Sequence, residues 1–119
     1  MGLKSAFLFL GAIVAGGILF ANDPLAIGSL GADYANLSKA EATKLGIAGG
    51  VVVTRIHEGE ALSNQTKMRV GFVITRIGNL PVTSIDGLKY ALSRQKSNFV
   101  IQGIYPGSKQ VYYYSIHDF

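Results

Sequence analysis

The stretch GFVITRIGNLPV, residues 71–82, decides the fold prediction for this chain. Its apolar and β-branched first half predicts a strand over residues 70–77, which a Gly-Asn turn closes. A Leu-Pro-Val piece follows, and it is expected to be extended because the residue before a proline avoids the helical region. Thr83 or Ser84 then caps a predicted helix that runs to about Gln95.

Further elements follow from the same kinds of signal on both sides of this stretch. Ser38, with Glu41 three residues later, is a capping box, and Gly46 ends the helix that it begins. The predicted elements are a strand at 30–36, a helix at 39–45, a strand at 51–56, a polar segment at 58–67 with one helical turn, and strands at 98–105 and 110–117 in a hairpin. Five or six short strands with two helices predict one α+β domain, a small barrel or sandwich.

Composition excludes several classes of protein. The chain has 119 residues and no cysteine, which rules out a disulfide scaffold, a thiolate zinc site and a thiol nucleophile. Its net charge is +4, but the basic residues are scattered and form no phosphate-tracking run, so no nucleic-acid partner is expected. The two histidines and seven acidic residues show no ligand spacing, so no metal and no cofactor are expected.

Catalysis also finds little support. His57 and His117 lie far apart in the sequence, and their neighbours Glu58 and Asp118 should face the opposite side of a strand. We therefore predict solvated histidines and, without a nucleophile motif, no enzyme. In the run Tyr112–Tyr114 the middle ring should point away from its two neighbours, as strand packing requires.

The first 22 residues form an apolar leader. No charged residue occurs from Ser5 to Asn22, and a helix over 5–22 would be about 27 Å long, close to the hydrocarbon thickness of a bilayer. A cleaved signal peptide with its apolar region at 6–14 is the rival interpretation. We favour an uncleaved anchor at 1–22, a linker at 23–28 and a domain at 29–119. Lys4 on one side and Asp23 on the other orient the N-terminus to the cytoplasm, and both interpretations export the domain.

Small residues inside the leader suit close packing between helices in lipid. Two small-xxx-small pairs are present: Gly11 with Ala15, and Ala12 with Gly16. Glycines are also common in membrane helices and signal peptides generally, so the pattern alone leaves helix packing open.

Three motifs in the right order resemble a PDZ domain in the circularly permuted bacterial form, most closely the second PDZ domain of HtrA/DegP-type serine proteases. The motifs are Leu30-Gly31-Ala32, residues 45–53 (LGIAGGVVV) and residues 71–82, and the likeness covers about residues 28–117. The chain departs from the family at Phe72, where the family usually has Asp. It also contains no protease domain and no Gly-Asn-Ser-Gly-Gly nucleophile loop.

The resemblance implies that a peptide binds by adding a strand to a sheet edge. A glycine loop would bind the terminal carboxylate, the strand after it would pair with the peptide, and the last helix would wall an apolar pocket. The implied peptide-binding residues are Ser29, Leu30, Gly31, Ala32, Asp33, Tyr34, Ser84, Leu88 and Ala91, whereas Ile85 and Leu92 would turn into the core. Without the resemblance, Gly31 would pass for a turn glycine and the helix stripe for ordinary core.

The leading hypothesis is a non-enzymatic PDZ module, anchored in the bacterial inner membrane through residues 5–21, that binds a protein partner or C-terminal peptide in the periplasm. One alternative is an accessory subunit of a larger membrane complex, which docks by its helix and PDZ surface without binding free peptides. Another is a detached protease fragment that regulates a protease in trans. A secreted domain, released by cleavage, is the alternative location.

Overall fold

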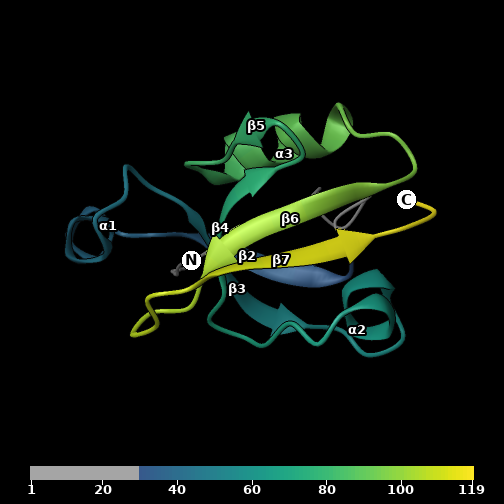
Figure 1. Cartoon of the computed structure of the whole chain (residues 1–119), viewed down its shortest axis with the longest axis horizontal. Coiled ribbons are helices and arrows are strands. Elements are labelled where there is room, and N and C mark those ends of the chain that lie inside the picture. Colours follow the sequence, from purple (N-terminus) through teal and green to yellow (C-terminus); the bar gives the residue numbers. More distant parts are fainter. Residues whose placement is uncertain (1–29) are drawn as a thin grey trace, which may run out of the picture.

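The computed structural model describes residues 30–119, which form strands and helices in the predicted order (Figure 1). The elements are β2 (Ala32–Asn36), α1 (Lys39–Leu45), β3 (Val51–Ile56), α2 (Ala61–Gln65), β4 (Val73–Ile77), β5 (Leu80–Pro81), α3 (Ile85–Ser93), β6 (Phe99–Ile104) and β7 (Val111–Ile116). Strands β6 and β7 cross the middle of the view in Figure 1, with α3 above them and α2 below.

All six described strands belong to one antiparallel sheet. Its order is β2-β3-β4-β6-β7, and the short β5 pairs with β4 outside this path. Within the described residues β2 pairs only with β3 and β7 only with β6, so these two strands form the ends of the described sheet. The predicted α+β class and strand number are therefore confirmed, whereas the expected barrel or sandwich is a single open sheet.

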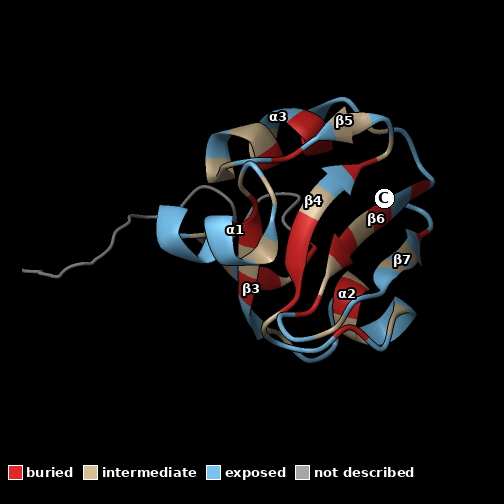
Figure 2. Ribbon diagram, turned by 60° about the vertical axis from the view of Figure 1, so that its left-hand side comes forward, coloured by how far each residue is buried: buried red, intermediate tan, exposed pale blue. Residues whose placement is uncertain are grey.

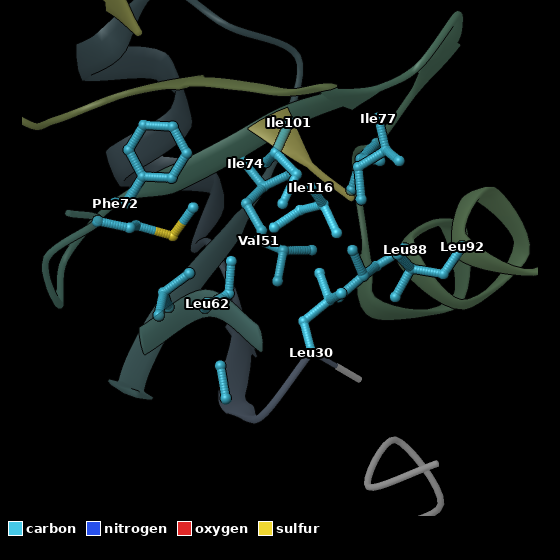
Figure 3. Close-up of a cluster of buried hydrophobic side chains, with 14 of the residues drawn as sticks. Leu30, Val51, Leu62, Phe72, Ile74, Ile77, Leu88, Leu92, Ile101 and Ile116 are labelled. Carbon is cyan, nitrogen blue, oxygen red and sulfur yellow. The ribbon is translucent and has the colours of Figure 1, made fainter. Parts of the chain in front are cut away.

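Figure 2 shows the buried positions along the inner sides of β3, β4 and β6 and on one face each of α2 and α3. In Figure 3 the side chains of Leu30, Leu62 and Leu88 converge on the isoleucines of the sheet. Each of these leucines comes from a different segment outside the sheet. The core thus joins α2, α3 and the loop that precedes β2 to one face of the sheet. Burial of each leucine side chain contributes about 2 kcal/mol to the stability of the folded state.

Local signals explain why these elements begin and end where they do. The Ser38 side chain accepts a hydrogen bond from the Glu41 N–H at 3.1 Å, and Gly46 ends α1 in the left-handed region with φ of 73°. Both ends of α1 are therefore as the sequence predicted. β3 also has the predicted bounds, because its β-branched residues fit a pleated surface.

Three details differ from the predictions. The polar segment holds a complete helix, α2, so the described residues contain three helices instead of two. The strand expected from residue 70 begins at Val73, because a turn precedes it. In this turn Gly71 has φ of 98°, and the Phe72 N–H donates to the Arg69 carbonyl at 3.3 Å. The strand expected from Leu30 begins at Ala32, for the reason given below.

The run of three tyrosines has the predicted alternation. Tyr113 is 65% exposed, whereas Tyr112 and Tyr114 pack against the core from the other side of β7. The Tyr114 hydroxyl lies 2.7 Å from that of Tyr105, which in turn accepts the Arg69 N–H at 2.9 Å. Burial, followed by the hydrogen bond to Tyr105, raises the pKa of Tyr114 to about 12.

The edge of β7 is partly occupied by a side chain. The amide of Gln65, at the end of α2, donates to the His117 carbonyl at 2.9 Å and accepts the His117 N–H at 2.7 Å. Both backbone groups of His117 are thereby satisfied as a neighbouring strand would satisfy them. This contact joins α2 to the end of the sheet.

Within residues 30–119 no helix has the length and apolar character that crossing a bilayer requires. The predicted anchor, its small residues Gly11, Ala12, Ala15 and Gly16, and the linker at 23–28 all lie outside the described residues.

Candidate functional site

Among residues 30–119 the outer side of β2 pairs with no other strand, so β2 is one end of the described sheet. The Gly31 carbonyl accepts an N–H from the end of β3 at 2.8 Å, and the Leu37 N–H donates to the residue before β3 at 3.0 Å. Gly31 and Leu37 are an even number of residues apart, and both bond toward β3. The odd-numbered residues of β2 between them therefore direct their N–H and C=O groups toward β3 as well. The N–H and C=O groups of Ala32, Tyr34 and Asn36 therefore point away from β3.

The loop before β2 directs two further amides to this side of β2. Leu30 and Gly31 have φ of 71° and 77°, which ends the extended conformation there. The Leu30 carbonyl accepts the Leu62 N–H at 3.1 Å, and the Gly31 carbonyl accepts the His57 N–H. In a trans peptide the N–H points opposite to the C=O, so the amides of Gly31 and Ala32 point away from α2 and β3. Two neighbouring amides with this orientation can bind an anion.

Gly31 is required in this loop by space as well as by φ. A Cβ on Gly31 would overlap the Cβ of Glu60, the residue that precedes α2. Glycine lets the loop lie directly on this helix end, where the Leu62 N–H fixes the Leu30 carbonyl. The contact with α2 therefore sets the direction of the loop amides.

Helix α3 begins with two caps, one of which comes from the end of β2. The Ser84 hydroxyl accepts the Gly87 N–H at 3.1 Å, as the sequence predicted for an N-cap. The Asn36 side chain, at the end of β2, accepts the Ile85 N–H at 2.7 Å. This second cap joins strand and helix directly, and it places the start of α3 at the far end of the β2 edge from Gly31.

The predicted peptide-binding residues that the structure describes differ in how far they are buried. Four of them are buried in the core, as is Leu92: Leu30, Ala32, Leu88 and Ala91. Three are half-buried, as is Ile85: Gly31, Tyr34 and Ser84. Asp33 is exposed. Ser29 lies outside the described residues. Leu88 and Ala91 pack as deeply as Leu92, because the whole apolar stripe of α3 faces the sheet. Their contact with a peptide stays a prediction.

Two polar features of β2 were not foreseen. The His57 Nε2 lies 3.0 Å from the Asp33 Oδ1, with both side chains partly exposed, at 38% and 54%. The sequence showed only Glu58 beside His57, because its true neighbour is 24 residues away on the next strand. Burial raises the pKa of Tyr34, with a smaller contribution from the Asp33 charge.

Among residues 30–119 no three His, Asp or Glu side chains gather as a metal-ligand set. His117 is exposed and engages Gln65 through its backbone. The geometry places at this point a strand edge, two neighbouring amides that point away from α2 and β3, and a helix beside them.

No protein-family model matches this chain, and no curated protein matches it either. Solved structures do match, among them the HtrA3 PDZ domain bound to a phage-derived ligand (FGRWV). That comparison has a TM-score of 0.60 and 12% sequence identity, and it covers 74% of this chain and 81% of the other. At this identity the likeness concerns the fold. The chain has a PDZ-like fold.

Proposed function

We propose that this protein is a non-catalytic binding module that accepts an extended peptide, ending in a free carboxylate, as an added strand along β2. The observation that carries the proposal is the joint direction of the Gly31 and Ala32 amides, which lie at the start of the side of β2 that pairs with no other strand among residues 30–119. A terminal carboxylate accepts both N–H groups, and the peptide then exchanges backbone hydrogen bonds with the outward residues of β2. The similar HtrA3 domain, with its bound pentapeptide, supports this use of the fold.

Amide chemical shifts would test this proposal without any substitution. The ¹⁵N-labelled full chain in detergent would be titrated with a library of heptapeptides that have free C-termini. We expect the largest shifts at Gly31, Ala32 and Tyr34. Shifts at Val111 and Tyr113 on the opposite edge, or none at all, would refute binding along β2. Amidated versions of the same peptides serve as the control, because they lack the carboxylate.

We also propose that residues 1–22 are an uncleaved anchor, that 23–28 are a linker, and that the domain at 29–119 lies on the extracytoplasmic side of the bacterial inner membrane. The uncharged leader and the flanking Lys4 and Asp23 support this. The intact mass of the protein extracted from membranes tests it. A mass for residues 1–119 is expected, whereas a mass lacking about 17–21 residues would indicate a secreted domain.

One observation favours the second candidate, an accessory subunit that docks through its surface. The outer face of the β6–β7 pair carries exposed apolar side chains: Val100 at 40%, Val111 at 47% and Tyr113 at 65%. Exposed apolar groups gathered on one face are typical of docking surfaces. If the protein is such a subunit, it co-purifies with membrane partners, and the peptide titration leaves the chemical shifts of the β2 amides unchanged.

A further inference from the structure

The edge of β2 carries a charged side chain at a defined position relative to the bound peptide. We propose that Asp33 selects ligands with a basic side chain, Lys or Arg, at the penultimate residue. This inference rests on the proposed function and goes further, because it states the class of sequence that the edge accepts.

The hydrogen-bond pattern fixes the position of each ligand residue. In an antiparallel pair, residues directly opposite each other alternate between pairs that exchange both N–H···O bonds and pairs that exchange none. A terminal carboxylate that accepts the Ala32 N–H therefore belongs to the residue opposite Ala32, whose own N–H donates to the Ala32 carbonyl. The chain of the ligand then runs backward along β2, so its penultimate residue lies opposite Asp33 and the one before it opposite Tyr34.

The side chains alternate in the same register. Ala32 and Tyr34 turn their side chains toward the core beneath α3, so the ligand residues opposite them turn into the space between β2 and α3. Asp33 points to the other, solvent side, where its side chain is 54% exposed. The penultimate ligand side chain meets Asp33 on that side, because opposite residues of a strand pair share a face.

The carboxylate of Asp33 has an oxygen that can accept from a cationic ligand side chain. Within residues 30–119 its only ion pair is with His57, which engages Oδ1 and leaves Oδ2 for a ligand. On β3, Arg55 lies directly opposite Asp33 in the register. A basic ligand residue on the other side of β2 would make the charges alternate across three neighbouring strands, positive, negative, positive. An acidic residue there would face Asp33 at the same separation and be repelled.

The preference is distinguishable from general electrostatic attraction. The whole chain has a net charge of +4, which favours acidic peptides over basic ones at long range. A preference for Lys at one position therefore runs against the overall charge and reports a local contact. Because that contact is partly exposed, salt should weaken it.

The test uses heptapeptides with free C-termini and randomised sequences, in three pools that have Lys, Ala or Glu at the penultimate position. Affinity selection would be carried out with the full chain in a neutral detergent, at 0.05 M and 0.5 M NaCl. We expect the Lys pool to bind about two- to fivefold more tightly than the Ala pool at low salt, and the Glu pool to bind less tightly than both.

Two substitutions of Asp33 and a matched control isolate its role. Asp33→Asn should remove the difference between pools, and Asp33→Lys should reverse it. Glu41→Gln, on α1, removes one negative charge as Asp33→Asn does, and it should leave the preference for Lys intact. The amide spectrum of each variant establishes that it is folded, and the comparison of pools on the unaltered chain does not depend on any variant.

Each outcome has a separate meaning. Equal binding of the three pools, with the β2 amides still shifting, would overturn the role of Asp33 and leave strand addition intact. A preference for Lys that persists in Asp33→Asn would also overturn it. Binding of no pool at all would overturn the proposed function itself, and the inference with it.

Discussion

At the scale of single residues, the loop that precedes β2 depends on one glycine. We predict that Gly31→Ala lowers the free energy of unfolding by about 3 kcal/mol, because the left-handed φ costs about 1–2 kcal/mol and the overlap with Glu60 adds to it. Urea denaturation measures the change. The same substitution should weaken peptide binding, since the Gly31 and Ala32 amides would be displaced.

Gly46→Ala is the matched control for this substitution. Gly46 has φ of 73°, close to that of Gly31, but a Cβ there would meet nothing within 4 Å. The cost should therefore be only that of the backbone, about 1 kcal/mol. Equal losses in the two variants would show that the contact between Gly31 and Glu60 contributes nothing.

Single residues also mark the limit of prediction from sequence. Gly31 could be recognised through its place in a family motif, but its neighbour Glu60 could not, because the two are joined only by the packing of α2. The contact between Asp33 and His57 depends on the register of β2 and β3, which shifts between Asp33 and Tyr34. A strand pattern predicts which face a residue occupies, but it gives no register across a bulge.

At the scale of elements, α3 depends on a cap donated by β2. Asn36→Ala removes the acceptor of the Ile85 N–H, and we predict a loss of about 1 kcal/mol in the free energy of unfolding. It should also weaken peptide binding, because α3 then loses its link to the strand that the ligand pairs with. Thermal denaturation and the peptide titration check the two effects.

Ser84→Ala provides the comparison, since Ser84 caps the same helix from within its own segment. Its stability loss should be similar, at about 1 kcal/mol, but the link between α3 and β2 remains. If both variants weakened peptide binding equally, the strand-to-helix contact of Asn36 would have no special part in the site.

The elements themselves were largely predictable, because their signals are local. The Ser38 cap, the β-branched run of β3 and the glycine after α1 each act within a few residues. The helix α2 was the exception: Glu60 gives it no side-chain cap, and the segment is polar. Burial of Leu62 and the contact of Gln65 with the end of the sheet stabilise this helix, and both are tertiary.

At the scale of the whole molecule, the Tyr105 hydroxyl joins its own segment to those of Arg69 and Tyr114. Tyr105→Phe removes the acceptor of the Arg69 N–H and the partner of the Tyr114 hydroxyl, so two polar groups lose their hydrogen bonds. We predict a loss of about 1–3 kcal/mol in the free energy of unfolding. Tyr113→Phe, at an exposed position, should change it by less than about 0.5 kcal/mol. Chemical denaturation of both variants is the measurement, and equal effects would contradict this role.

The closure of the sheet could not be predicted at this scale. Counting strands led to a barrel or sandwich, because alternation and turns show how many strands exist but not whether the first and last meet. In the described residues they do not meet: β2 and β7 end the sheet separately. The open edge at β2, on which the candidate site depends, is thus a property of topology.

The Gln65 amide on the edge of β7 bears on where a further strand can pair. A filament built by edge-to-edge pairing needs two unpaired sheet edges on every copy, so that each copy can pair with a neighbour on both sides. By taking both backbone groups of His117, Gln65 shortens the edge at β7, and among residues 30–119 no other strand pairs with the outer side of β2. Addition of a further strand should therefore be favoured at β2 over the end of β7.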